Sequence, residues 1–452
     1  MTQTWGTVQD VSDYLRKGYW DGTPRQFDLD ANNNILYYNV SGWLEDNDGL
    51  TQDRANLVHQ AFNVYGNALG IDFRVTTSTG DDVDFFFSDN DQGAYACNAG
   101  LGNFIDYSFI NISSDWCWGD SSLGGYTFQT ILHEIGHGLG LGHPGNYNIT
   151  ADFDTSAIFA NDSWHMSIMS YFDQEQNPHN FVEFSFLSTP AVADWNALYN
   201  MYGYGNAFPG NTRYGFNTNI SLDNSSVWHN FSDLITTNSF TITDGSGDDT
   251  LDVSEFDDDQ FINLNPTSPD DIMPQSSDIG GLIGNLTIAP NTIIERAIGG
   301  YGNDTIIGNN ANNTLYGRQG HDWLTGLGGD DIIYGGKGND WLTGGPGNDT
   351  LYGNRGYNTF RGDNDGDADT IVIDWCRNSS QADNICSLDT SDQIVMQNFN
   401  NRPLSFGYVS NHRNVHGDML SGIGIYASNR LQAVYTGTNL SYDQVQSMTW
   451  TV

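Results

Sequence analysis

The sequence predicts an α+β domain over residues 1–206, followed over residues 207–452 by an all-β domain that forms a parallel β-roll. Three observations lead to this prediction. A histidine motif with helical spacing lies in the first half, a nine-residue repeat lies in the second half, and Gly, Asn and Asp become frequent from about Asn206 onward. A chain of 452 residues is long enough for two domains that each bury an apolar core.

The first half mixes helical and strand patterns. The amphipathic stretch Gln52–Leu69 predicts a helix, and a second helix is expected to begin near Thr127. A third is expected from Thr189 to Tyr202, with Thr189 as its cap and Pro190 in its first turn. Apolar alternation and short apolar runs predict strands at 71–75, 82–88, 94–96 and 109–112. The histidine motif therefore lies in a domain of both helices and strands.

Residues 299–361 repeat with a period of nine. In register the units are GGYGNDTII, GNNANNTLY, GRQGHDWLT, GLGGDDIIY, GGKGNDWLT, GGPGNDTLY and GNRGYNTFR, and an isolated unit, DGSGDDTLD, occupies residues 244–252. The sixth residue of each tandem unit is Asp or Asn, and the eighth is always apolar. The last three residues of a unit can form a short strand with its apolar side chain inward, while the Gly-rich residues turn the corner. Two units then make one coil of a parallel roll.

The stacked corners of this roll call for a cation. Stacking two units apart is expected to place Asp304, Asp322 and Asp340 along one edge and Asn313, Asp331, Asp349 and Asn358 along the other. Carboxylates stacked about 4.7–4.9 Å apart would repel one another strongly unless a hard cation with about six oxygen ligands lay between them. The repeat is that of the RTX parallel β-roll, so we expect several structural Ca²⁺ ions, bound more weakly where Asn replaces Asp. The alternative is a disordered Gly/Asn-rich linker.

Residues 133–143 contain the pattern HExxHxxGxxH. His133 and His137 lie four residues apart on one helix face, with Cβ atoms about 6 Å apart, so both imidazoles can bind one tetrahedral ion. Gly140 lets the chain leave the helix in a conformation that other residues avoid, and His143 then becomes the third ligand. Glu134 can take a proton from a metal-bound water and return it to the leaving amine.

The motif therefore predicts one catalytic Zn²⁺ bound by three histidines. A solvated surface helix and a purely structural zinc site are the alternatives. The adjacent Glu134 and an open fourth coordination position favour catalysis.

The charge balance excludes some partners. The chain has 56 acidic and 15 basic residues, a net charge of −41, which makes unaided binding to nucleic acid or to an anionic membrane unfavourable. No apolar run approaches the roughly 18 residues that span a bilayer, and the polar residues 1–10 lack a secretory apolar region. We therefore expect either a leader that was removed or export by another signal.

Four cysteines form two sequence-local pairs, Cys97 with Cys117 and Cys376 with Cys386. Neither pair has metal-binding spacing, and an even count at close spacing in an acidic chain that we expect to be exported favours two disulfides. Four free thiols are the alternative. The first pair is expected to staple the rim of the catalytic cleft.

The sequence Ser-Ile-Met-Ser-Tyr follows the histidine motif at residues 167–171, and with it the chain resembles the metzincins and in particular the serralysins, secreted bacterial metalloproteases that carry an RTX roll. The similar segments are Thr130–Asn148, Ser167–Phe172, Asp278–Gly300 and the nonapeptides, so that most of residues 11–361 is covered. The resemblance implies a metzincin catalytic domain followed by the calcium-binding roll. Serralysins generally lack cysteine, and the region after Arg361 shares little with them beyond Ile394–Phe399.

The resemblance also implies residue roles. Met169 forms an apolar floor beneath the zinc, and Tyr171 is a distant zinc ligand that swings away to stabilise the oxyanion. Ala94, Tyr95 and Ala96 correspond to an edge strand to which a peptide adds as an antiparallel strand, and binding through main-chain hydrogen bonds implies broad specificity.

The calcium ligands implied by the family fall into two groups. A first site, in which Asn211 replaces the family's Asp, comprises Phe208, Gly210, Thr212, Asp244, Ser246 and Asp249. The tandem repeats supply the first, third and sixth residues of five units: Gly299, Tyr301, Asp304, Gly317, Gln319, Asp322, Gly326, Gly328, Asp331, Gly335, Lys337, Asp340, Gly344, Pro346 and Asp349.

The expected function is that of a secreted, extracellular, zinc-dependent endopeptidase of broad specificity, stabilised by calcium and monomeric. Its expected partners are polypeptide substrates, a small proteinaceous inhibitor and a type I secretion system. One alternative is a calcium-dependent binding or adhesion module with a degenerate zinc domain. The intact set of His133, Glu134, His137, His143 and Tyr171 argues against degeneration. The other alternative is a metalloenzyme that hydrolyses a non-peptide substrate.

Overall fold

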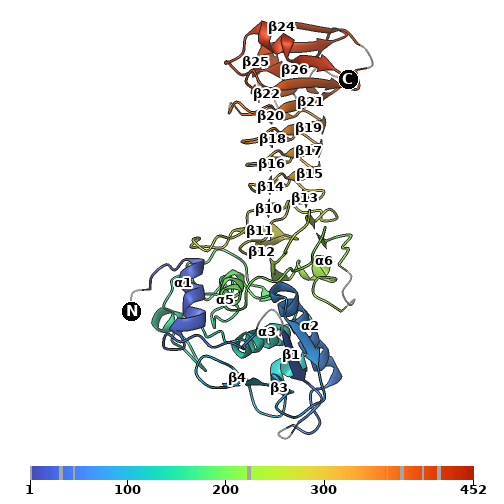
Figure 1. Ribbon diagram of the computed structural model, residues 1–452. Coiled ribbons are helices and arrows are strands. Elements are labelled where there is room, and N and C mark those ends of the chain that lie inside the picture. The colour runs from blue at the N-terminus through green and yellow to red at the C-terminus, as the bar shows by residue number, and fades with distance from the viewer. Residues whose placement is uncertain are drawn as a thin grey trace. The chain divides into compact units, whose positions relative to one another are not determined.

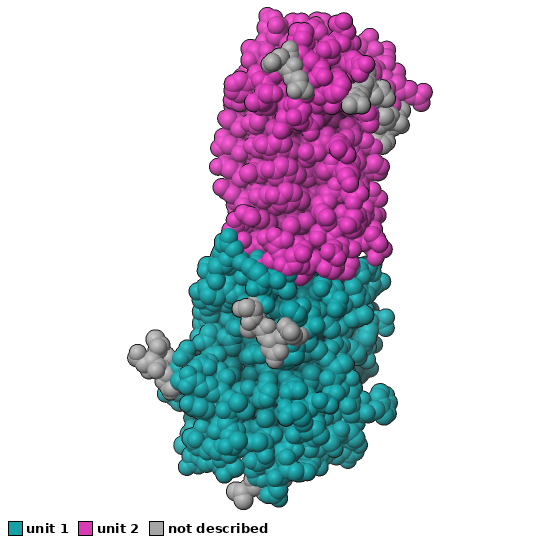
Figure 2. Space-filling model, turned by 90° about the vertical axis from the view of Figure 1, so that its right-hand side faces the viewer, with its two compact units in different colours: residues 1–212, 218–247, 266–292 teal, residues 213–217, 248–265, 293–452 magenta. Residues whose placement is uncertain are grey.

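The computed structural model describes residues 3–29, 34–43, 46–220, 225–363, 365–376, 381–399, 402–414 and 419–452 (Figure 1). The chain forms two compact units (Figure 2). Unit 1 contains residues 1–212, 218–247 and 266–292, and unit 2 contains residues 213–217, 248–265 and 293–452. Because both units are discontinuous along the chain, the domain boundary after residue 206 stays a prediction.

A five-stranded sheet with strand order β2-β1-β3-β5-β4 lies in unit 1. Its strands are β1 (Ile35–Asn39), β2 (Asp72–Val75), β3 (Phe85–Ser88), β4 (Ala94–Ala99) and β5 (Tyr107–Ile112). The pairs are parallel except for β4, which runs antiparallel to β5 and forms one edge. The sheet thus presents an antiparallel edge strand, the arrangement expected for residues 94–96.

Helices α2 (Gln52–Leu69) and α3 (Tyr126–Gly138) pack against one face of this sheet (Figure 1). The buried Phe62 of α2 contacts Phe85 and Phe87 of β3, with ring centroids 5.2 and 5.9 Å apart. The prediction of α2 is confirmed at both ends, and α2 ends at Gly70 in the left-handed conformation common after helices. The helix that carries the histidine motif begins one residue before the predicted Thr127.

The remaining elements of unit 1 surround this core. They are α1 (Val8–Asp13) with a π-helical turn at Tyr14–Gly18, a 3₁₀ turn at Trp116–Gly119, α4 (Phe153–Ser156), α5 (Val192–Tyr202), α6 (Phe231–Leu234) and the strands β6 (Phe186–Leu187), β8 (Asn238–Ile242), β11 (Ser276–Ile279) and β12 (Leu282–Ile288). Among the described residues, no helix is both long and apolar enough to cross a membrane.

The expected start of the third helix at Thr189 is wrong. Helix α5 begins at Val192, and Ala191 is its cap. The carboxylate of Asp194 accepts a hydrogen bond from the Ala191 N–H at 2.9 Å, while the hydroxyl of Thr189 accepts one from Thr241 N–H at 2.7 Å instead of capping the helix. A carboxylate in the first turn therefore satisfies the orphan N–H that a Thr cap would have taken.

Unit 2 is the predicted parallel roll, seen in Figure 1 as a ladder of short stacked strands. One sheet has the order β27-β23-β21-β19-β17-β15-β13-β9-β7 and the facing row runs β24-β25-β26-β22-β20-β18-β16-β14-β10. The register pairs Ile306 with Leu324 and Leu315 with Ile333, residues 18 apart, so two nonapeptides make one coil as expected. The eighth residues of all seven units are fully buried between the sheets: Ile306, Leu315, Leu324, Ile333, Leu342, Leu351 and Phe360.

The strands of the roll are short, as the repeat predicts. They are β7 (Arg213–Gly215), β9 (Thr250–Asp252), β10 (Phe261–Asn263), β13 (Arg296–Ile298), β14 (Thr305–Ile307), β15 (Thr314–Gln319), β16 (Trp323–Thr325), β17 (Ile332–Lys337), β18 (Trp341–Thr343), β19 (Thr350–Arg355) and β20 (Thr359–Arg361). Beyond the tandem repeats lie β21 (Thr370–Asp374), β22 (Asp383–Ser387), β23 (Gln393–Gln397), β24 (Leu404–Arg413), β25 (Met419–Ala427), β26 (Arg430–Tyr435), α7 (Tyr442–Ser447) and β27 (Thr449–Thr451).

The predicted disulfides are wrong, because all four cysteines are free. Cys97 of β4 lines a surface hollow beside Phe109, whereas Cys117 lies in the 3₁₀ turn Trp116–Gly119. Cys376 follows β21 and Cys386 lies in β22, and these two strands belong to opposite sheets of the roll. The Cys376 thiol contacts the Leu431 carbonyl oxygen at 3.6 Å, and the Cys386 sulfur accepts a hydrogen bond from the Asn384 amide at 3.1 Å.

Candidate metal centre and active site

Helix α3 and the turn that follows it bring His133, His137 and His143 together. One ring nitrogen from each lies within 4.8 Å of the others. The predicted Gly140 adopts φ +101°, and a Cβ there would lie 1.9 Å from the Arg25 carbonyl oxygen. Only glycine fits this position, so the tight exit from α3 that returns His143 depends on it.

Backbone carbonyls hold all three imidazoles in one tautomer. The Nδ1 atoms of the three histidines each lie 2.8 Å from a carbonyl oxygen: Ile168 for His133, Leu141 for His137 and Tyr147 for His143. Nδ1 therefore carries the proton, and every Nε2 presents a lone pair to the centre of the cluster.

These lone pairs fit a cation. The Nε2 atoms of His137 and His143 are 3.0 Å apart, and with both Nδ1 atoms protonated neither Nε2 of the neutral rings has a proton to donate to the other. Two facing lone pairs at this distance repel unless a positive ion lies between them. Burial lowers the pKa of His133 to about 4 and that of His143 to about 3, so both rings are neutral ligands at physiological pH. Three neutral imidazoles with a fourth direction open are the donor set of a catalytic zinc.

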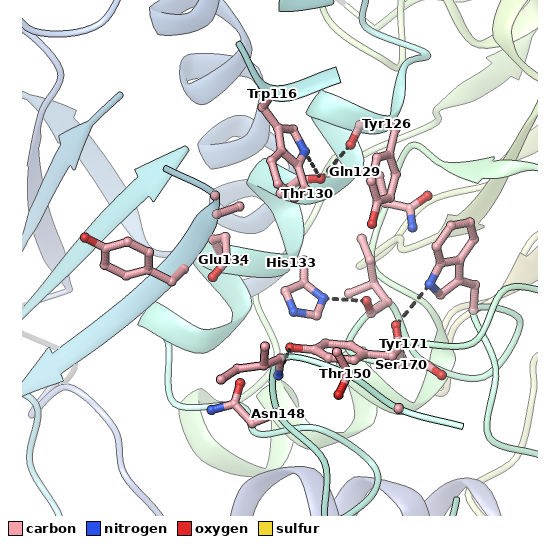
Figure 3. A pocket seen from close by; sticks show the side chains of 17 residues that line it. Trp116, Tyr126, Gln129, Thr130, His133, Glu134, Asn148, Thr150, Ser170 and Tyr171 are labelled. Carbon is pink, nitrogen blue, oxygen red and sulfur yellow. Dashed lines mark hydrogen bonds between the residues drawn. The ribbon is translucent and has the colours of Figure 1, made fainter. Parts of the chain in front are cut away.

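Glu134 lies next to His133 on the same helix and faces the same cleft (Figure 3). Its side chain is 5% exposed, and its Oε2 atom is buried without a hydrogen-bond partner in the described part of the chain. Burial raises the pKa of this carboxyl to about 8. An unpartnered buried carboxyl oxygen beside the histidine cluster has the position of a general base that awaits a water molecule.

The cleft that contains these groups has a volume of about 650 Å³. Its lining includes Ala94 and Tyr95 of edge strand β4, but not Ala96. Trp116, Tyr126 and Trp164 supply aromatic walls, and Trp116 is held by a 3.1 Å hydrogen bond from its indole N–H to Thr130. The spacing of HExxH gives no indication of these three aromatic residues. Edge strand β4 borders the cleft, as substrate pairing along it requires.

Met169 and Tyr171 belong to the turn that follows the histidine motif. Met169 is fully buried. The ring of Tyr171 lies 6.2 Å from that of His133 (Figure 3) and 4.5 Å from that of His143. Its hydroxyl accepts a 3.4 Å hydrogen bond from Ile149 N–H. Tyr171 thus packs beside the histidine cluster at the floor of the cleft.

Two buried carboxylates that sequence reasoning missed hold the turn around Met169. Asp194 accepts hydrogen bonds from the Ser167 hydroxyl at 2.6 Å and from Ile168 N–H at 2.7 Å. Asp162 accepts one from the Ser170 hydroxyl at 2.7 Å. Each is a lone Asp in the sequence with no motif around it, so only the tertiary structure identifies them.

In unit 2 the repeat aspartates form two hydrogen-bonded ladders. The Asp304 N–H donates to Asp322 Oδ1 at 2.9 Å, and Asp322 N–H donates to Asp340 Oδ1 at 3.1 Å. The next rung is Asn358, whose Oδ1 accepts from Asp340 N–H. The assignment of Asn358 to the edge of Asp349 is therefore wrong, because residues 18 apart share an edge.

The second oxygens of these carboxylates have no partner. The Oδ2 atoms of four predicted ligands are buried and, among the described residues, accept no hydrogen bond: Asp322, Asp331, Asp340 and Asp349. A Cβ at Gly317 would lie 2.4 Å from Asp322 Oδ2 and 2.6 Å from the Gly335 carbonyl oxygen, so glycine is required for this close approach. Buried, unpartnered carboxylate oxygens next to carbonyl oxygens fit a hard cation such as Ca²⁺.

The ladders extend beyond the tandem repeats. Asn358 N–H donates to Asp383, Asp349 N–H to Asp369, and Asp369 N–H to Asp392, at 2.8–2.9 Å. Asp369 Oδ2 is also buried without a partner. The nine-residue period does not predict these three rungs, because their spacing departs from 18 residues.

The other predicted calcium ligands lie on the same turns. Residues 299, 301, 319, 326, 328, 335, 337, 344 and 346 follow or end the short strands of the roll, as the repeat register requires. In unit 1 the carbonyl oxygens of Phe208 and Gly210 both accept hydrogen bonds from Thr212, and Gly210 N–H donates to Ser246. The Ser246 N–H in turn donates to Asp244 Oδ1 at 3.2 Å, whereas Asp249 belongs to unit 2.

Comparison with known proteins agrees with this geometry. The family model for the C-terminal part of peptidase M10 serralysins matches residues 206–422. The metalloprotease AprA of Pseudomonas entomophila (strain L48) is 43% identical over 185 residues, 40% of this chain and 36% of that protein. Serralysin of Photorhabdus luminescens is 42% identical over 188 residues, 40% of this chain and 36% of that protein. Serralysin of Proteus mirabilis is 37% identical over 202 residues, 44% of this chain and 38% of that protein. The matched region thus spans little more than a third of each relative.

Proposed function

This chain belongs to the serralysin family, and from that premise we propose that it is a secreted, zinc-dependent endopeptidase that cleaves extracellular polypeptides with broad specificity. The observation that carries the proposal is the convergence of three Nε2 lone pairs beside the unpartnered carboxyl of Glu134. The exposed edge of β4 in the same cleft supports an extended peptide as the substrate, since it can pair with one as a further strand.

His133, His137 and His143 would hold the zinc. Zinc bound there supplies Lewis acidity, which lowers the pKa of a bound water toward 7. Glu134 takes the proton of the attacking water and returns it to the leaving amine nitrogen. The Tyr171 hydroxyl donates to the oxygen that becomes negative in the tetrahedral intermediate. The carbonyls of Ile168, Leu141 and Tyr147 keep the imidazoles in the ligating tautomer throughout.

Calcium is proposed as the second, structural metal. The unpartnered Oδ2 atoms of the repeat aspartates support binding at the corners of the roll, and the carbonyl oxygens at the first and third positions of the repeat units would be further ligands. On family resemblance alone, we also propose that the protein is a monomer. A small proteinaceous inhibitor and a type I secretion system are its proposed further partners.

The test of the function is digestion of casein and gelatin in calcium-containing buffer, with mass spectrometry to identify new peptide termini. The proposal expects cleavage at many internal peptide bonds. Hydrolysis of small esters without protein cleavage would instead support a non-peptide hydrolase. A zinc-loaded protein that cleaves neither would support a binding module.

Replacing Tyr171 with Phe is expected to lower kcat on a peptide substrate by about 10²–10³-fold, because one donor to the oxyanion is lost. KM and the zinc content should change little, since the histidines remain. Tyr95→Phe is the matched control, because Tyr95 lines the same cleft but its hydroxyl bonds Asp91. Equal kcat values for the Tyr171→Phe variant and the wild type would refute the role of the hydroxyl.

A further inference from the structure

Asp162 is a fully buried carboxylate that links two segments of the active site. Its Oδ1 and Oδ2 atoms accept hydrogen bonds from the Tyr147 hydroxyl at 3.2 and 2.9 Å, and Oδ1 also accepts one from the Ser170 hydroxyl at 2.7 Å. Tyr147 follows the third histidine, and Ser170 lies between Met169 and Tyr171. One side chain therefore ties the loop after α3 to the turn under the histidine cluster.

Tyr147, which hydrogen-bonds Asp162, also contacts the metal ligand His143. The carbonyl oxygen of Tyr147 is the acceptor for His143 Nδ1 at 2.8 Å, and the Tyr147 ring stacks on the His143 ring, with centroids 5.4 Å apart and planes 23° apart. A tyrosine anchored at its hydroxyl fixes both the carbonyl that selects the tautomer of His143 and the ring that limits its rotation. The Ser170 contact in turn anchors the residue before Tyr171.

The charge of Asp162 has no basic partner within the described chain. The ion pairs found there join Arg16 to Asp13, Arg74 to Asp72, Arg213 to Asp252, Arg296 to Asp248 and Arg361 to Asp363. A buried carboxylate that is bonded only to hydroxyl groups is costly in the absence of a nearby cation. Glu134 and Asp194 are buried around the same cluster and also take no part in these ion pairs. A divalent ion held by the three neutral histidines would favour the charged form of these carboxyls, whose pKa burial otherwise raises.

We propose that Asp162 is a positioning residue that acts through Tyr147 on His143 and thereby tightens zinc binding. The inference rests on the proposed zinc site. Asp162 touches neither substrate nor metal, so its effect is expected in the affinity for the ion and in the geometry of the ligand. A role in packing alone would change stability but leave the zinc affinity of the folded protein unaltered.

The test measures zinc affinity by competition with a chelator in Asp162→Asn, Tyr147→Phe and the double variant. Each single variant is expected to bind zinc up to about 10-fold more weakly, the lower end of the cost of losing a partner of a ligating histidine, because the Tyr147 carbonyl remains and only its anchoring is lost. The double variant should bind zinc no more weakly than the weaker-binding single variant, because both substitutions break the same chain of contacts from Asp162 through Tyr147 to His143. The visible spectrum of the Co²⁺-substituted protein should shift in the same variants.

Tyr202→Phe is the matched control. Its hydroxyl is half-buried and donates to the Leu139 carbonyl at 2.8 Å, and that carbonyl bonds no ligating histidine. It should retain wild-type zinc affinity. Unchanged affinity in folded Asp162→Asn, or additive losses in the double variant, would overturn the proposal. If Asp162→Asn fails to fold, the zinc affinities of Tyr147→Phe and Ser170→Ala test the proposal in the same assay, and unchanged affinity in both would overturn it.

The outcomes separate this inference from the proposed function. A wild type that binds zinc and cleaves casein, with variants of equal zinc affinity, contradicts only the role of Asp162. A wild type that binds no zinc contradicts both.

Discussion

Glu134→Gln is expected to lower kcat on casein-derived peptides by about 10²–10⁴-fold, while zinc stays bound. Gln keeps the shape of the side chain but cannot accept the proton of the attacking water. The three histidines and their carbonyl acceptors do not depend on the Glu134 carboxyl, so the metal site remains. The measurement pairs steady-state kinetics with the zinc content of the same sample.

Glu175→Gln provides the control for this substitution, because Glu175 is an exposed residue of the same unit and lies outside the cleft. Its kinetics should match the wild type. A Glu134→Gln variant that retains zinc and cleaves at the wild-type rate would show that another group is the base.

Removing calcium is expected to unfold the roll. A site saturated at a thousand times its Kd contributes about 4 kcal/mol of folding free energy. In a unit of this size, that loss lowers Tm by about 8–16 °C for each site. The physical reason is the row of buried Oδ2 atoms, which repel one another when no ion lies between them. Circular dichroism and calorimetry with and without excess chelator measure the effect, and an unchanged transition would contradict calcium binding.

Two adjacent aspartates provide a matched pair for the calcium prediction. Asp331 is buried in the ladder, whereas Asp330 is exposed and accepts hydrogen bonds from Asn348. Asp331→Asn should raise the calcium concentration needed for folding, and Asp330→Asn should leave it near the wild-type value. If both variants needed the same calcium concentration for half-maximal folding, the assignment of Asp331 to the ladder would be contradicted.

The calcium-free protein should also respond to pH in a defined direction. Burial raises the pKa of Asp322 to about 8 and that of Asp331 to about 7 in the folded, metal-free chain, above the ordinary value of 3.8. A carboxyl with a raised folded pKa stabilises the fold fully below its unfolded pKa and loses that contribution as the pH rises through its folded pKa. In chelator, Tm should therefore fall between pH 4 and pH 8, and calcium should remove this fall. A calcium-free Tm that rises over the same range would contradict the assignment.

The chain folds as a metzincin domain and a parallel β-roll, and the sequence predicted both because their signals are periodic. The HExxHxxGxxH spacing predicted which histidines converge, since positions four apart share a helix face. It could not predict the orienting carbonyls of Ile168, Leu141 and Tyr147, because any residue type supplies a carbonyl. Asp162 and Asp194 were missed for a related reason: their roles depend on contacts between segments far apart in the sequence.

The end of the roll was missed because insertions disturb its period. Asp369, Asp383 and Asp392 are 20, 25 and 23 residues from the preceding rungs of their ladders. A local signal was nevertheless present, since each is followed two residues later by a buried isoleucine: Ile371, Ile385 and Ile394. The same Asp-x-apolar pattern occurs in every tandem unit with Asp at the sixth position. Tracking that pattern without a fixed period would have identified the three rungs.

The disulfide predictions failed because sequence proximity does not fix side-chain direction. Cys376 and Cys386 are ten residues apart, yet Cys376 follows a strand of one sheet of the roll and Cys386 lies in a strand of the other. A disulfide needs Cβ atoms about 3.5–4.5 Å apart, which spacing alone does not guarantee.

The most direct test of the central claim is casein hydrolysis by the purified protein before and after treatment with 1,10-phenanthroline, followed by zinc, with calcium present throughout. A catalytic zinc on His133, His137 and His143 predicts that activity is lost on chelation and restored by zinc. Activity that survives complete removal of zinc would contradict a zinc-dependent peptidase.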